Sequence, residues 1–186
     1  MRYRYSHIFG PISLNTLIIS VTLLVNWSIA HSSPPDAEMC AFLERFHGHV
    51  CPGSLMGLRL GLAAKEALNA QGKIKAETFL HACSVDGIQI ATGATLGNKS
   101  FILEDRGEMY LILTDVGNGK QVEARLTKEA MNRGKKFREL SDKARSIDDG
   151  SSERSAIQKE IDAVLEWFRT APDSEVVTVK VLKEQK

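Results

Sequence analysis

The histidines and cysteines of this sequence lie close together, and they are the residues best suited to carry out chemistry. Beyond residue 33 the chain has three histidines, and all of them fall with two of its three cysteines into the windows 47–51 and 81–83. The residues concerned are His47, His49, Cys51, His81 and Cys83. Imidazole and thiolate are the ligands that Zn²⁺ prefers, and a thiol beside an imidazole is also the pairing used in nucleophilic catalysis.

The sequence places both cysteines where a thiolate is favoured. Pro52 disfavours the α conformation at Cys51, so Cys51 stands at the entrance of the helix that follows. Cys83 lies just ahead of a helical turn that begins at Asp86. Helix N-termini carry partial positive charge and free N–H groups, which stabilise a thiolate. The two cysteines are therefore candidates for metal ligands, for a nucleophile with its resolving partner, or for a disulfide, which is the common state in an oxidising compartment.

Other polar residues near these windows have simpler interpretations. A histidine such as His49 is, by itself, more often packed or solvated than a ligand. Asp86, with Gln89 three residues later, is typical of a helix cap, and a ligand role for Asp86 is the less favoured alternative. Cys40 lies on an amphipathic segment and is expected to be buried and inert. Arg59 is expected to be a solvated helix residue, with the alternative that it holds an acidic substrate.

The hydrophobic pattern indicates which elements must position these residues. It predicts helices over 36–46, 52 to 69 or 71 (closed by Gly72), 127–146 and 152–170, with a helical turn at 86–90. It predicts strands over 78–83, 100–104, 108–116, 120–126 and 176–182. Alternation along the first strand would put Phe79, His81 and Cys83 on one face. Residues 117–119 and 105–107 are expected to be the turns of two hairpins. The fold class is α+β, an antiparallel sheet with a hairpin packed against several helices in a single domain.

Three glycines recur every four residues along the second predicted helix. Each of Gly53, Gly57 and Gly61 costs about 1 kcal/mol relative to alanine in a helix, so the series implies a close approach to another element or to a ligand. A Gly/Thr loop at 92–98 is compatible with an anion-binding turn, although no lysine follows it in the register of a phosphate loop. These features keep open a module that binds a small ligand or anion.

The first thirty residues are typical of a secretory signal peptide. Arg2 and Arg4 precede an apolar stretch over 14–29, and Ser28-Ile29-Ala30 fits a cleavage site. The competing interpretation, an uncleaved anchor, is weakened because the stretch is shorter than the ~20 residues that span a bilayer. We therefore expect a signal peptide at 1–30, a linker at 31–35 and one domain at 36–186. The protein would be periplasmic or secreted, with no membrane contact after cleavage.

Charge and size exclude some classes of partner. Lys and Arg number 24 against 23 Asp and Glu, so the chain has no basic footprint for nucleic acid. We expect a small-molecule ligand or a metal as partner. The size of the domain is also compatible with a homodimer.

The two windows resemble the motifs of a known family. Phe46-His47-Gly48-His49-Val50-Cys51-Pro52-Gly53, with Arg59 and the glycine series, resembles the first motif of the FmdE family, named after a component of formylmethanofuran dehydrogenase. The segments 83–89 and 92–98 resemble its second motif. The resemblance implies an α+β core with a metal-holding cleft, commonly for zinc, and it carries over to His47, His49, Cys51, Cys83, Asp86 and Gln89. Many members have a cysteine where Ala94 stands and a C-terminal zinc-finger domain that we do not expect in this exported chain.

Three hypotheses follow for the function. The first is an exported zinc-binding protein whose candidate metal ligands are Cys51, Cys83, His47 and His49, with an open position for water or substrate. The second is the module for a small ligand or anion, and the third is a thiol-based redox or nucleophilic protein that uses Cys51 and Cys83. The sequence does not determine a reaction or a substrate, and it does not decide whether the protein is an enzyme.

Overall fold

The structure, a computed structural model, describes residues 33–183. The signal peptide predicted for residues 1–30 therefore lies outside the described residues, and so does the start of the linker. No helix within residues 33–183 combines the length and the apolar character that crossing a bilayer requires. The helices are α1 (Ala37–His47), α2 (Pro52–Leu68), α3 (Ser84–Thr92), α4 (Lys128–Arg145), α5 (Ser152–Thr170) and α6 (Asp173–Val176). The strands are β1 (Ile74–Phe79), β2 (Phe101–Leu103), β3 (Glu108–Asp115), β4 (Gln121–Leu126) and β5 (Val177–Lys183).

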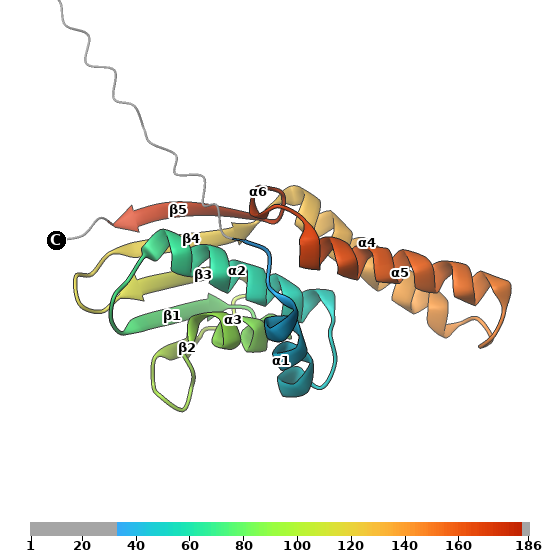
Figure 1. The fold of residues 1–186 in the computed structure, drawn as a ribbon, viewed down its shortest axis with the longest axis horizontal. Coiled ribbons are helices and arrows are strands. Elements are labelled where there is room, and N and C mark those ends of the chain that lie inside the picture. The colour runs from blue at the N-terminus through green and yellow to red at the C-terminus, as the bar shows by residue number, and fades with distance from the viewer. Residues whose placement is uncertain (1–32, 184–186) are drawn as a thin grey trace, which may run out of the picture.

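The five strands form one sheet in the order β2-β1-β3-β4-β5 (Figure 1). All neighbouring strands are antiparallel except β1 and β2, which are parallel with Ala76 opposite Phe101. The prediction of an α+β domain with a largely antiparallel sheet is confirmed. The hairpin turn at 117–119 is also confirmed, since it joins β3 to β4 and the Gly119 amide donates to the Asp115 carbonyl.

The hairpin expected at 105–107 is wrong. β2 and β3 do not pair, because β1 lies between them and uses one edge for each. The pairing of β1 with β3 matches their burial. Ala76 and Thr78 of β1 lie opposite Leu113 and Leu111 of β3, and all four residues are buried.

The first strand itself begins and ends earlier than the sequence predicts. β1 covers Ile74–Phe79, so His81 and Cys83 are not strand residues and do not share a face with Phe79. Residues 80–83 leave the sheet because the chain already turns into α3, with Cys83 in the αR conformation at the N-cap. The short helix α6, which precedes β5, had no signal in the hydrophobic pattern.

The long helices begin where the capping residues predict. Asp36 and Thr127 each accept a hydrogen bond from the backbone N–H three residues on, at the starts of α1 and α4. α2 ends at Leu68, within one residue of the first of the two predicted ends, and its left-handed cap is Asn69 instead of Gly72. α2 lies across one face of the sheet, and its Leu55 and Leu58 are fully buried with Leu111 and Leu113 (Figure 1).

The glycine series on α2 faces α3. A methyl group at Gly57 would overlap the Ser84 backbone, and one at Gly61 would overlap the Ala91 side chain. A methyl group at Gly87 of α3 would likewise overlap the Ser54 carbonyl of α2. The predicted close approach is confirmed, and the partner is a second helix.

Arg59 is neither solvated nor placed to hold a substrate. Its side chain is fully buried, donates to the Phe168 and Ala171 carbonyls at 3.1 and 2.6 Å, and pairs with Asp173. Arg59 thus connects the centre of α2 to the end of α5 and the chain that follows it.

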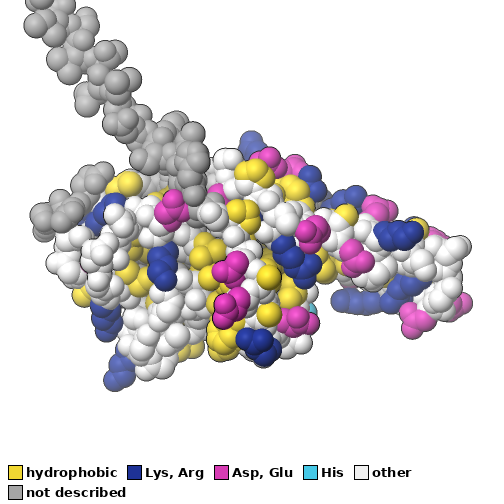
Figure 2. Space-filling model, in the orientation of Figure 1, with side chains coloured by type: hydrophobic (Ala, Val, Ile, Leu, Met, Phe, Trp, Pro, Cys, Tyr) yellow, Lys and Arg dark blue, Asp and Glu magenta, His cyan; other side chains and the backbone are white. Residues whose placement is uncertain are grey.

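α4 and α5 form a hairpin that extends beyond the end of the sheet (Figure 1). Acidic and basic side chains are interspersed over the face drawn in Figure 2.

Candidate metal centre

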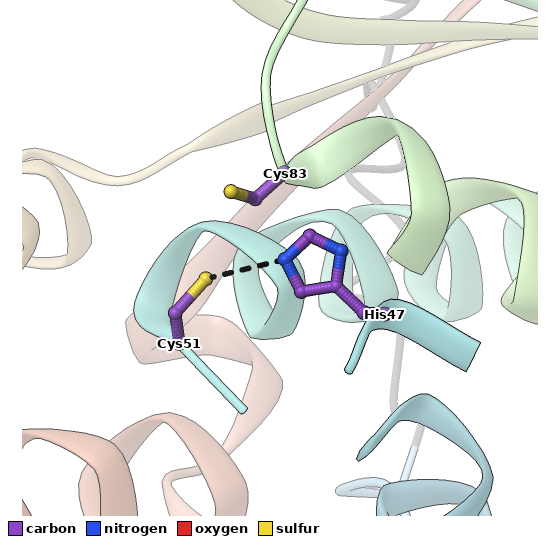
Figure 3. A group of neighbouring side chains, drawn as sticks. All are labelled: His47, Cys51 and Cys83. Carbon is purple, nitrogen blue, oxygen red and sulfur yellow. Dashed lines mark hydrogen bonds between the residues drawn. The ribbon is translucent and has the colours of Figure 1, made fainter. Parts of the chain in front are cut away.

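Three of the predicted site residues meet at the ends of three helices. His47 is the last residue of α1, Cys51 is the N-cap of α2 and Cys83 is the N-cap of α3. Each offers one ligand atom, and these atoms all lie within 4.8 Å of one another (Figure 3). The His47 Nε2 and Cys51 Sγ atoms are 3.9 Å apart. Residues 36 positions apart in the sequence, His47 and Cys83, are thus brought to one point.

A local turn brings His47 and Cys51 together. Gly48 ends α1 in the left-handed conformation, with φ 86° and its amide bonded to the Glu44 carbonyl. Glycine is favoured there because a side chain would be strained at that φ. Cys51 then takes an extended conformation, φ −132° and ψ 162°, before Pro52 begins α2. The reversal at Gly48 therefore lets the end of one helix face the start of the next.

The approach of α2 to α3 brings in Cys83. A methyl group at Gly53 would lie 3.1 Å from the Cys83 Cβ, 3.7 Å from the Cys51 Sγ and 3.9 Å from the Cys83 Sγ. The missing side chain of Gly53 therefore leaves room beside both sulfurs. Cys83 is exposed, while His47 and Cys51 are half-buried, so the group opens to solvent on the Cys83 side.

The surroundings of the two thiols differ. The Cys51 Sγ accepts from the Ser54 amide at 3.4 Å and lies 3.5 Å from the Ser54 hydroxyl, which is the capping interaction at the start of α2. Desolvation raises the pKa of the Cys83 thiol, and the neighbouring Cys51 raises it further. A divalent cation beside both sulfurs would offset the unfavourable effect of Cys51 on a Cys83 thiolate, because the cation is attracted to both thiolates at once.

Asp86 is not the helix cap that the sequence predicts. No side chain caps α3 at its N-cap residue, and the Asp86 Oδ2 instead lies 2.6 Å from the His47 Nδ1. Gln89 lies apart from this contact, since its Oε1 accepts from the Leu96 amide. The sequence did contain a signal for Asp86: it stands three residues after Cys83, and therefore about one helical turn further along.

The remaining predicted residues lie beside the group or away from it. The His49 ring packs against the His47 ring with centroids 4.7 Å apart, but it is exposed and contributes no atom to the three-residue group. His81 is exposed, and its backbone amide faces Asp105. Cys40 is half-buried, and burial raises the pKa of its thiol, consistent with the inert role expected of it. All three cysteines are free in the described residues.

The donor set fits a metal ion. In a tetrahedral zinc site with metal–ligand bonds of about 2.0–2.3 Å, ligand atoms are about 3.6–3.8 Å apart. The 3.9 Å between His47 Nε2 and Cys51 Sγ is close to that value. No two ligand atoms of the group are more than 4.8 Å apart, so the largest separation would shorten by about 1 Å when a metal binds. The arrangement is a His/Cys group that can bind a metal.

Fold and site together define an α+β domain with a histidine–cysteine group at the meeting point of three helix ends. A family model described as "FmdE, Molybdenum formylmethanofuran dehydrogenase operon" matches residues 46–178, which include the whole group. The chain belongs to the FmdE family.

Two known proteins are similar to this chain, one in sequence and one in fold. The chain is 33% identical over 132 residues to a protein of Archaeoglobus fulgidus named "Probable S-adenosyl-L-methionine-binding protein", an alignment that covers 64% of this chain. It covers 36% of the relative, so the chain spans about a third of the length of that protein. A crystal structure of a tungsten formylmethanofuran dehydrogenase FmdE-like protein from Syntrophus aciditrophicus has the same fold, with a TM-score of 0.56 and 22% identity over 80% of this chain and 72% of that one.

Proposed function

We propose that this protein binds one divalent metal ion, zinc, through His47, Cys51 and Cys83. The observation that carries the proposal is the placement of their three ligand atoms within 4.8 Å of one another. Two thiolates and one imidazole form a soft donor set of the kind that zinc prefers. The room left by Gly53 and the helix N-terminus at Cys51 support the same assignment.

Three protein ligands would leave a fourth coordination position open, on the exposed Cys83 side. Zinc held by these three residues would supply Lewis-acid chemistry to the site. The protein's own contribution is to fix the two sulfurs by the packing of α2 against α3 and to keep His47 at the end of α1. His49, exposed and packed against His47, is placed at the rim of the group.

We propose further that the domain acts outside the cytoplasm. The basic start, the apolar stretch over 14–29 and the Ser28-Ile29-Ala30 exit support export and cleavage after Ala30. N-terminal sequencing of protein from the periplasm or medium tests this. A mature chain beginning at His31 is expected, whereas an intact Met1 terminus in the membrane fraction would contradict it.

Metal content is the decisive measurement for the metal function. Protein purified without chelator or nickel affinity is expected to contain about one zinc per chain by elemental analysis. His47→Ala, Cys51→Ser and Cys83→Ser should each lower that content well below one, because each removes a donor. Cys40→Ser is the matched control, since it removes a thiol outside the group and should leave the content unchanged. Unchanged stoichiometry in both Cys51→Ser and Cys83→Ser would refute the proposal.

A thiol redox function is the second candidate, because Cys51 and Cys83 are free and their sulfurs lie within 4.8 Å. Two electrons and two protons would pass from the two thiols to the disulfide of a partner, forming the Cys51–Cys83 bond and releasing two partner thiols. Counting free thiols with and without reductant separates the candidates. A reversible loss of two thiols in metal-free protein favours redox chemistry, and thiols protected by a stoichiometric metal favour the metal centre.

A further inference from the structure

We propose that Asp86 is a positioning residue of the metal centre, whose carboxylate holds the His47 ring so that Nε2 faces the two cysteine sulfurs. The proposal rests on the proposed function, in which His47 is a metal ligand. Among the described side chains that surround the three-residue group, Asp86 is the carboxylate in direct contact with one of its members.

The geometry determines which nitrogen of His47 is available. Asp86 Oδ2 lies 2.6 Å from Nδ1, and an ionised carboxylate can only accept a hydrogen bond, so Nδ1 carries the proton. In a neutral ring the lone pair then resides on Nε2. That atom lies 3.9 Å from the Cys51 Sγ, on the side of the ring where the sulfurs are. A carboxylate behind a histidine ligand fixes its tautomer and raises its basicity.

The contact is partly shielded from water. The His47 side chain is 12% exposed and the Asp86 side chain 32% exposed. A hydrogen bond with an ionised acceptor is stronger where water competes less for it. Asp86 therefore contacts His47 at Nδ1, while the other ring nitrogen, Nε2, faces the Cys51 Sγ.

One short helix supplies both a ligand and its support. Cys83 is the N-cap of α3 and Asp86 follows in the first turn, so the same helix presents one sulfur and the carboxylate that orients the histidine. Close packing on the glycines of α2 fixes α3 against Cys51. A shift of α3 would therefore move Cys83 together with the carboxylate that contacts His47.

The test measures Zn²⁺ affinity by competition with a chromophoric chelator for the wild type, Asp86→Ala and Asp86→Asn. Asp86→Ala is expected to weaken Zn²⁺ binding about 10–100-fold, the usual effect of losing such a support. Asp86→Asn keeps an oxygen acceptor for Nδ1–H and should lie nearer the wild type. Asp162→Ala removes an exposed carboxylate on α5 that accepts from Gln158, and it serves as the control with unchanged affinity.

A double-mutant cycle shows whether Asp86 acts through His47. In a His47→Ala background, Asp86→Ala should cost little further affinity, and an equal loss in both backgrounds would overturn the proposal. ¹⁵N NMR of the metal-free protein should report the Nδ1–H tautomer of His47 in the wild type and its loss in Asp86→Ala. An unchanged tautomer would also overturn it. If His47→Ala binds Zn²⁺ like the wild type, the proposed ligand set fails, whereas weak binding by His47→Ala with normal binding by Asp86→Ala refutes only the role of Asp86.

Discussion

At the scale of single residues, Gly53 decides how much space remains beside the two sulfurs. Its φ is not in the left-handed region, so backbone freedom does not explain a glycine at this position. The explanation lies in its neighbours, since a methyl group would lie 3.1 Å from the Cys83 Cβ and within 4 Å of both sulfurs. Glycine at this position therefore leaves space beside the Cys51 and Cys83 sulfurs.

We therefore expect Gly53→Ala to weaken Zn²⁺ affinity by about tenfold, the scale of changes just outside a ligand set. The contact is with a side-chain atom that can move by a few tenths of an ångström, and alanine favours helix by about 1 kcal/mol, so stability should change little. Chelator competition and thermal melting of the same sample check both parts. Full Zn²⁺ affinity in a stably folded Gly53→Ala protein would contradict this account of Gly53.

At the scale of elements, the crossing of α2 and α3 sets the distance between the cysteines. Gly57 and Gly87 allow the two backbones to touch, and the N-termini of both helices then meet at Cys51 and Cys83. The helices themselves contribute no ligand beyond their caps. Their spacing is nevertheless what makes the sulfurs neighbours.

Gly57→Ala is expected to behave differently from Gly53→Ala. The new methyl group would overlap the backbone of Ser84, which cannot rotate away, so the helices must separate. Overpacking of this kind costs about 1–3 kcal/mol, and the loss should appear as a lower urea midpoint together with weaker metal binding. A wild-type urea midpoint for Gly57→Ala would show that α2 and α3 are not held as closely as described.

At the scale of the whole molecule, Arg59 connects the centre of α2 to the C-terminal part of the domain. Its guanidinium donates to the Phe168 carbonyl in the last turn of α5 and to the Ala171 carbonyl just after it, and it pairs with the Asp173 carboxylate at the start of α6. Burial raises the pKa of the Asp173 carboxyl, and the neighbouring Arg59 opposes that rise. The pair orders the route from α5 into β5, and so completes the sheet that supports α2.

Asp173→Ala should destabilise the fold by about 3–5 kcal/mol, because it leaves the Arg59 guanidinium buried without its counter-ion. Chemical denaturation of the metal-free protein measures this without involving the metal group. The double variant Arg59→Met with Asp173→Leu should be less destabilised than Asp173→Ala, since it buries no unpaired charge. Equal losses in the two proteins would refute the electrostatic explanation.

Much of the secondary structure could be predicted because it depends on local signals. Asp36, Pro52 and Thr127 mark the starts of three helices by capping chemistry that acts within one turn. The turn at 117–119 also depends on a local signal, since Gly119 adopts a positive φ and donates to the Asp115 carbonyl. Thr78 and Phe79 lie in β1 as predicted, but residues 80–83 were misassigned because alternation alone cannot distinguish a strand from a loop that precedes a helix. The homodimer and the exported location stay predictions.

Local patterns were enough to identify the chemical types at the site, since the histidines and cysteines gather in two short windows and a proline places Cys51 at a helix start. The packing of the helices had to be known before it was clear that Cys83 completes the group, that Asp86 contacts His47 instead of capping α3, and that Arg59 is buried. The physical reason is that each of these depends on a contact between residues distant in the chain. Such contacts depend on how α2 packs on the sheet and against α3. Local sequence patterns do not predict this packing.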